Sequence, residues 1–157
     1  MITNALARHL REVYLTGNWT STSLKKELSE VSLTEATRRV ENLNTLLRLA
    51  YHIHYYLRVQ MRVLRGGPLE GHDRFSFDHP ELKTEAEWQE FLQHLWIEIE
   101  QFAELVEALP DDRLHQSFAD PKYGTLHRNL VGFLEHTNYH LGQIVMIKKL
   151  LQLPNDQ

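Results

Sequence analysis

Apolar residues recur at the roughly 3.6-residue spacing of an α-helix through most of this chain, and this periodicity restricts its fold more than any other feature. Three long segments carry it, at about residues 34–64, 84–109 and 126–153, and a shorter segment covers residues 2–15. Breaking residues follow the long segments, in the letters RGGP, LPDD and LPND. Because no segment reads convincingly as a β-strand, the sequence predicts an all-α protein built as a four-helix bundle.

Capping residues precede the predicted helices. Serine and threonine side chains accept hydrogen bonds from the first free backbone N–H groups of a helix. The candidate caps are Ser21 or Ser23, Ser32 or Thr34, Thr84 and Thr125. The first pair predicts an additional short helix near the N-terminus, with Leu24 and Leu28 inside it. The second pair begins a long helix that runs to about Leu64, with Val40 and Leu43 in its apolar stripe.

Length and charge restrict the classes of function. We expect residues 1–157 to form a single domain, since this length is enough for one hydrophobic core. The net charge of −4 argues against a nucleic-acid partner, which needs clustered Lys and Arg. The N-terminus lacks the apolar core of a signal peptide, and no apolar run approaches the ~20 residues that span a bilayer. We therefore expect a cytoplasmic protein without membrane contact, and the absence of Cys excludes a Cys-ligated zinc site.

The chain contains 10 histidines, an unusually high number, and two of them stand four positions apart in the last predicted helix. His136 and His140 would share a helix face with Phe133 and Ile147, so both imidazoles should point into the bundle. They are either two core histidines with separate hydrogen-bond partners or two ligands of one divalent ion. Thr137 stands where the H-E-x-x-H zinc motif has its glutamate base, so a peptidase of that type is not expected.

A third ligand has to come from another helix, and the letters AYHIHYYL offer His52 and His54. Two residues apart on a helix, they face nearly opposite directions. His54 lies within the main apolar stripe, whereas His52 shares a second apolar stripe with Leu49 and Tyr56. Periodicity favours His54, but it does not decide between them, because the second stripe could face either the core or an oligomer interface.

The remaining histidines are interpreted as polar surface residues. Four of them have no second candidate ligand at a suitable spacing in the sequence, namely His9, His94, His115 and His127. The long connection over residues 66–82 contains a group that could hold a metal ion but is better interpreted as turn caps, namely His72, Asp73, Asp78 and His79. We expect Phe75 and Phe77 in the same connection to pack against the helices.

Two motifs together resemble a known family. The letters EHTNYHLGQI are similar to the last-helix signature of the DinB-like (DinB/YfiT-like) superfamily of metal-dependent four-helix-bundle enzymes, and AYHIHYYL resembles its histidine-bearing second main helix. The longer stretches HIHYYLRVQMRVLRGGPLEGHDRFSFD and KYGTLHRNLVGFLEHTNYHLGQIVMIKKLL resemble one branch of that superfamily. The resemblance extends from about residue 24 onward.

The resemblance implies a three-histidine site for a divalent metal ion. Its two last-helix ligands correspond to His136 and His140. In the family pattern, an aliphatic residue follows the first ligand and a large residue stands four positions on. His52, followed by Ile53 and Tyr56, matches this pattern better than His54, so we select His52. Imidazole ligands favour Zn²⁺ or Ni²⁺, with Fe²⁺ and Mn²⁺ as alternatives.

Two classes of function follow from these observations. Three imidazoles leave a coordination position open, which is typical of catalytic sites, and the resemblance implies a thiol-dependent S-transferase or a hydrolase acting on a small molecule such as a low-molecular-weight thiol. The alternative is a non-enzymatic binding or stress-related bundle, since the sequence shows no acid, base or nucleophile beside the ion. Tyr139 is expected to flank the site or pack at a helix interface, and Gln143 to hydrogen-bond a ligand or the backbone. The second stripe and the resemblance also predict a homodimer.

Overall fold

The computed structural model describes residues 1–153, and within that range the regular secondary structure is helical, with six α-helices and no β-strand. The helices are α1 (Ile2–Arg11), α2 (Leu24–Leu28), α3 (Leu33–Thr37), α4 (Leu46–Leu64), α5 (Glu85–Glu107) and α6 (Leu126–Gln152). The all-α prediction is confirmed, and so is the short helix near the N-terminus. None of the described helices combines the length and the apolar character needed to cross a membrane.

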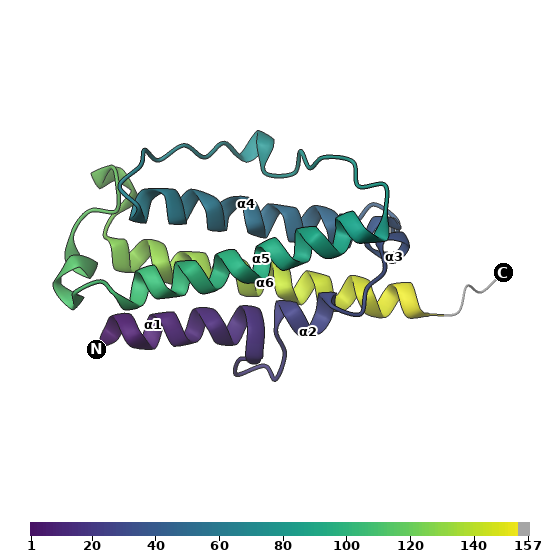
Figure 1. Ribbon diagram of the computed structural model, residues 1–157, viewed down its shortest axis with the longest axis horizontal. Coiled ribbons are helices and arrows are strands. Elements are labelled where there is room, and N and C mark those ends of the chain that lie inside the picture. Colours follow the sequence, from purple (N-terminus) through teal and green to yellow (C-terminus); the bar gives the residue numbers. More distant parts are fainter. Residues whose placement is uncertain (154–157) are drawn as a thin grey trace.

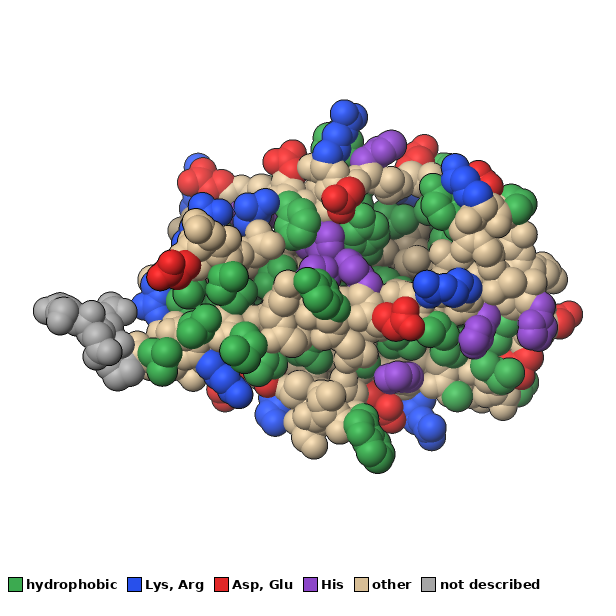
Figure 2. Space-filling view, turned by 180° about the vertical axis from the view of Figure 1, so that it is seen from behind, with side chains coloured by type: hydrophobic (Ala, Val, Ile, Leu, Met, Phe, Trp, Pro, Cys, Tyr) green, Lys and Arg blue, Asp and Glu red, His purple; other side chains and the backbone are tan. Residues whose placement is uncertain are grey.

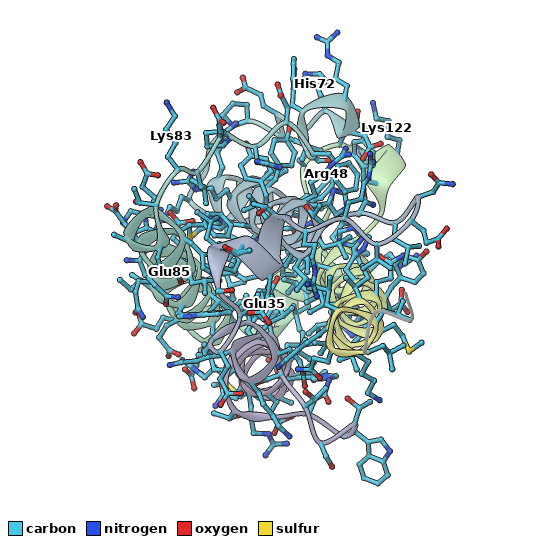
Figure 3. The ribbon with its side chains drawn as sticks, turned by 90° about the vertical axis from the view of Figure 1, so that its right-hand side faces the viewer. Glu35, Arg48, His72, Lys83, Glu85 and Lys122 are labelled. Carbon is cyan, nitrogen blue, oxygen red and sulfur yellow. The ribbon has the colours of Figure 1, made fainter. Side chains whose placement is uncertain are left out.

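Four of the helices, α1, α4, α5 and α6, lie side by side along the long axis of the molecule (Figure 1). Helix α5 contacts α1 and α4, and α6 contacts the same two helices. Seen nearly end-on in Figure 3, they surround a common interior. The largest fully buried side chains in this interior include Trp88, Tyr14, Phe102, Leu10 and Ile53. Aromatic and aliphatic burial of this kind is the main force that holds the helices together.

Side-chain caps fix where the helices begin. Ser23, Ser32, Thr84 and Thr125 each accept a hydrogen bond from a backbone N–H in the first turn, as predicted from the sequence. Ser23 rather than Ser21 is the cap of α2. Helix α1 continues through a π-helical turn at Glu12–Thr16, which ends at Gly17. Gly17 has a φ of +117°, a conformation that a residue with a side chain rarely adopts.

The long helix predicted from Ser32 or Thr34 to about Leu64 was wrong, because the chain breaks between α3 and α4. Arg38 leaves α3 in an extended conformation and Glu41 has a φ of +49°. Thr45 then starts a new helix by accepting from the Arg48 N–H. The intervening letters ENLN contain two asparagines, whose side chains compete with helical hydrogen bonds. Leu43 is consequently 43% exposed instead of lying in a buried stripe.

The break lets α3 fold back against α4 at one end of the molecule. Glu35 and Glu85, both labelled in Figure 3, fix this arrangement. The carboxylate of Glu35 accepts from the Ser32 N–H and completes a capping box in α3. The Glu85 carboxylate, in the first turn of α5, accepts from the Leu33 N–H at 2.7 Å. The N-terminus of α3 is therefore tied to the N-terminus of α5.

The connection between α4 and α5 runs back along α4 and covers its outer side (Figure 1). The Tyr55 hydroxyl accepts from the His72 N–H at 2.8 Å, and a single 3₁₀ turn follows at Asp73–Phe75. Phe77 packs against the hydrophobic core, as predicted. Phe75 does not, since it is 43% exposed, and the prediction that it packs against the helices was wrong.

Candidate metal centre

Three imidazoles from two helices converge beneath the connection between α4 and α5. His52 comes from the middle of α4, and His136 and His140 come from successive turns of α6. The His52 and His136 Nε2 atoms lie 2.9 Å apart, and the His136 and His140 Nε2 atoms lie 3.0 Å apart. One nitrogen from each ring falls within 4.8 Å of the other two. Within residues 1–153, this is the one cluster of three histidine or carboxylate side chains close enough to hold a metal ion.

The outer nitrogens of two rings are fixed by hydrogen bonds. The Ser76 hydroxyl lies 2.9 Å from His52 Nδ1 and donates its single proton to the Asp73 carbonyl at 2.7 Å. It therefore accepts from His52, whose proton sits on Nδ1. The Gln143 side-chain carbonyl lies 2.7 Å from His140 Nδ1 and also accepts. Both rings consequently direct an unprotonated Nε2 toward His136.

This arrangement calls for a cation. A neutral His136 carries at most one proton on Nε2, so it can donate to only one of its two neighbours. The other close contact then brings two lone pairs together at about 3 Å. Two nitrogens bound at a right angle to one ion, at about 2.0–2.1 Å each, would also lie about 3 Å apart. The donor atoms and their spacing thus fit a divalent ion.

Burial keeps these imidazoles neutral. Burial is the larger cause and the neighbouring imidazoles add to it, so that the pKa of both His52 and His136 is lowered to about 4. Burial also lowers the pKa of His140, against the opposing effect of its hydrogen bond to Gln143. Neutral imidazole is the form that binds a metal, so none of the three rings has to give up a net positive charge near neutral pH.

Aromatic rings hold the His52 side chain in place. Phe77 stacks on the His52 ring at 4.1 Å between centroids with an interplanar angle of 9°. Tyr56 packs edge-on against His52 at 5.1 Å and against His136 at 5.2 Å. Because Phe77 belongs to the connection and Tyr56 to α4, the connection and the helix together fix the ring orientation. The connection is thus part of the site.

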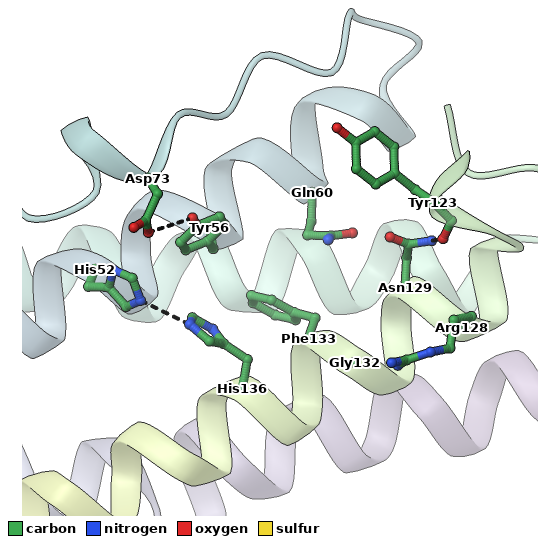
Figure 4. Close-up of a pocket in the computed structure, with 10 residues that line it drawn as sticks. All are labelled: His52, Tyr56, Gln60, Asp73, Tyr123, Arg128, Asn129, Gly132, Phe133 and His136. Carbon is green, nitrogen blue, oxygen red and sulfur yellow. Dashed lines mark hydrogen bonds between the residues drawn. The ribbon is translucent and has the colours of Figure 1, made fainter. Parts of the chain in front are cut away.

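A pocket of about 510 Å³ opens beside the imidazoles. His52, Tyr56 and His136 line one end, and Arg128 and Asn129 line the other (Figure 4). In the space-filling view, histidine side chains are visible at the centre of the face, in a hollow between neighbouring side chains (Figure 2). A small molecule can therefore reach the imidazoles from outside.

Asp73 is a functional candidate that the sequence placed in a possible metal-binding group of the connection but favoured as a turn cap; it is not part of the cluster that could hold an ion. It lines the same pocket as His52 and His136. Its carboxylate accepts from the Tyr56 hydroxyl at 3.1 Å. Burial and the bond to Asp73 raise the pKa of Tyr56 to about 12, so this hydroxyl stays a donor. Neither Asp73 nor the Ser76–Phe77 pair that follows it carries a sequence signal that Asp73 lines the pocket. Its position depends on how the whole connection folds.

His54, the alternative first ligand, faces away from the cluster. Its Nε2 lies 2.7 Å from the Glu98 carboxylate of α5, and Arg58 donates to the same carboxylate. Burial lowers the pKa of His54, although Glu98 opposes this effect. His54 thus belongs to a buried polar pair between α4 and α5, and His52 is the histidine of α4 that meets the other two.

The other histidines named from the sequence lie outside the cluster. Four of them are exposed as predicted, namely His9, His94, His115 and His127. His79 Nδ1 lies 2.9 Å from the Pro80 carbonyl, and His72 is exposed. Gln143 bonds to His140 as expected, and Tyr139 flanks the site by packing edge-on against the His140 ring at 5.0 Å. Thr137 is buried and donates to the Phe133 carbonyl, so it makes no contact that would replace a glutamate base.

Comparison with known proteins adds no family assignment: no family model, curated protein or solved structure matches the chain. The fold and the site define an all-α protein with a buried three-histidine group that could bind a metal ion. The similarity to the DinB-like superfamily stays a prediction from the motifs of α4 and α6.

Proposed function

We propose that the protein is a metal-dependent enzyme in which His52, His136 and His140 bind a divalent ion. Zn²⁺ and Ni²⁺ are the favoured ions, with Fe²⁺ and Mn²⁺ as alternatives. The proposal includes a four-helix bundle of the DinB-like type, formed by α1, α4, α5 and α6, and a thiol-dependent S-transferase or hydrolase activity on a small molecule. The motifs quoted above support that part.

One observation carries the proposal: the three imidazoles are preoriented, and a pocket reaches two of them. A purely structural site is closed by its protein ligands, whereas a catalytic site keeps a position for water or substrate. Ser76 and Gln143 hold the outer nitrogens, as is usual for histidines that bind metals. The open side favours catalysis over the structural alternative.

The chain supplies the proton chemistry around such an ion. A bound divalent ion would lower the pKa of a water or deprotonate a thiol. Asp73 is the carboxylate that lines the pocket beside His52 and His136, and Tyr56 orients it. We assign to Asp73 the role of accepting the proton released by the bound nucleophile. Tyr56 keeps its own proton and stabilises the charge on Asp73.

Metal analysis of the purified protein tests the ligand assignment. We expect about one divalent ion per chain, and its loss in His136→Ala and His140→Ala. His127→Ala is the matched control, since His127 lies on the same helix but is exposed. A wild-type content below about 0.2 ion per chain, unchanged by reconstitution, would refute the metal site.

The Asp73→Asn variant separates an enzyme from a structural metalloprotein. It should keep the metal and the fold, while turnover of a thiol or ester substrate falls by about 10²–10⁴-fold. If wild-type protein shows no turnover in thiol-transfer and hydrolysis screens, and removal of the metal only lowers its thermal stability, the structural alternative is favoured.

A further inference from the structure

A stripe of four residues on α6 leads from the far end of the pocket to the imidazoles. Arg128, Gly132, His136 and His140 follow one another at intervals of four positions. Residues at this spacing are neighbours on a helix surface, and each step advances about 6 Å along the axis. The first three line the pocket. Figure 4 shows the Arg128 side chain extended along the helix toward Gly132.

Gly132 is what allows the guanidinium to lie there. A Cβ atom at position 132 would come within 2.8 Å of the Arg128 Nη1 atom. Glycine inside a helix lowers its stability relative to alanine. At position 132 the close approach of Arg128 is a local feature that a larger residue would disturb. Gly142 on the same helix is different, because a Cβ there would meet nothing within 4 Å.

The guanidinium is available to a ligand. The Arg128 Nη1 atom lies 3.5 Å from the Glu135 carboxylate, but both side chains are 67% exposed. An ion pair in this setting is weak and readily exchanged for a better-placed anion. Asp73 stands at the opposite, imidazole end of the pocket. The pocket therefore has a carboxylate at one end and a guanidinium at the other. The guanidinium lies about one helical turn from His136.

The pocket wall also holds an acceptor that lacks a partner. The side-chain carbonyl of Gln60 is buried and has no hydrogen-bond partner among the described residues. It lines the pocket between its two ends (Figure 4). A buried acceptor without a partner is costly.

We propose that Arg128 binds the oxyanion of a small-molecule ligand, a carboxylate or a phosphate, whose other end reaches His52 and His136. The role of the imidazole end rests on the metal-dependent function proposed above. The anionic end rests on Arg128 and Gly132 alone. Since the guanidinium lies about one turn, or about 6 Å, from His136, the two ends of the ligand are separated by a short spacer.

Thiol probes with the same three-carbon spacer and different end groups test this assignment. Protein loaded with Co²⁺ is titrated with 4-mercaptobutyrate, its neutral amide and 3-mercaptopropylphosphonate, and the thiolate-to-cobalt absorption band reports binding. The wild-type protein should bind the charged probes about tenfold more tightly than the amide. The tighter of the two charged probes identifies carboxylate or phosphate as the natural group. In Arg128→Gln the preference should fall to within about twofold, with the Co²⁺ content unchanged.

Glycine variants give a sharper contrast. Gly132→Ala should weaken the charge preference, because its methyl group shifts the guanidinium, while thermal stability stays equal or rises. Gly142→Ala changes the same helix in the same way without touching Arg128, so it should keep the preference. Glu135→Gln should tighten binding of the charged probes, because it removes a competitor for Arg128.

Equal binding of the acid and the amide by wild-type protein, or a preference that survives in Arg128→Gln, would overturn the assignment. If the protein takes up no Co²⁺, the proposed metal function fails, and the anion subsite is tested separately. Metal-free protein is then titrated with inorganic phosphate, and the amide signals of Gly132 and Asn129 are followed by NMR. Shifts that are abolished in Arg128→Gln support the subsite, and their absence from wild-type protein refutes it.

Discussion

The two ring nitrogens of His52 face different surroundings, and this difference gives the residue its role. Nδ1 donates to Ser76, and Nε2 faces His136. His54, two positions later, is equally buried but bonds to Glu98. Residue type and burial are therefore the same for His52 and His54. What makes His52 a candidate ligand and His54 part of a buried polar pair is the side chain that each one meets on a neighbouring helix.

Acid should destabilise the metal-free protein in a defined pH range. His52 and His136 have pKa values of about 4 in the folded protein, against about 6.5 for an unfolded chain. Between these values the unfolded chain binds more protons, so stability is complete above pH 6.5 and falls as the pH drops toward 4. The loss attributable to His52 is on the order of 3 kcal/mol.

Urea denaturation at pH 7, 6 and 5 in the presence of a chelator measures this effect. A variant in which His52 and His136 are both replaced by Gln should show a flatter dependence over the same range. Constant stability of the wild-type protein from pH 6.5 to pH 5 would contradict the stated burial of neutral imidazoles.

At the scale of elements, the connection between α4 and α5 has a structural role in the site. It brings Ser76 to the outer nitrogen of His52, places Phe77 on the ring and sets Asp73 beside the pocket. Ser76 and Phe77 thus act on His52, and Asp73 contacts a second side chain of α4, Tyr56. A connection of this length in a compact domain is often functional, and here its contacts account for its path.

Two phenylalanines of this connection make a matched test. Phe77→Ala removes the stack on His52 and should cost about 2–4 kcal/mol of stability together with part of the metal affinity, since Phe77 is partly buried. Phe75→Ala deletes the same side chain from an exposed position and should change stability by less than about 0.5 kcal/mol. Thermal unfolding and metal titration measure both effects. Similar losses in the two variants would contradict the assigned contacts.

At the scale of the whole molecule, the second apolar stripe of α4 is used inside the chain. Leu49 and Val59 on that stripe are buried, and Gly71 of the connection packs against Val59. The stripe therefore cannot supply the dimer interface expected from it. Exposed apolar side chains lie elsewhere, at Tyr139 and Met146 on α6.

We expect a homodimer that uses this face of α6. Sedimentation velocity at micromolar concentration should show a dimer for the wild-type protein. Met146→Glu should shift it to monomer, since a charge in an apolar interface costs desolvation energy, while Ile97→Glu on exposed α5 surface should not. A wild-type monomer would remove the prediction.

The sequence by itself determined the all-α fold, the helix starts at Thr84 and Thr125, and the shared face of His136 and His140. These features depend on interactions within a few residues, which periodicity and capping chemistry report directly. The sequence did not predict the break before Thr45, because the apolar spacing continues through the letters ENLN. The chain there is nevertheless not helical.

Helical periodicity left open which histidine of α4 meets α6, and His52 was selected only through the motif resemblance. The tertiary structure decided this point, and it alone decided which polar groups surround the cluster. Both faces of α4 are buried, so the helical wheel could not distinguish His52 from His54. Asp73 lines the pocket because of the path of the connection between α4 and α5. Arg128 lines it because Gly132 leaves space for the guanidinium. Contacts between segments far apart in the chain depend on how the helices pack, and a local sequence pattern does not predict that packing.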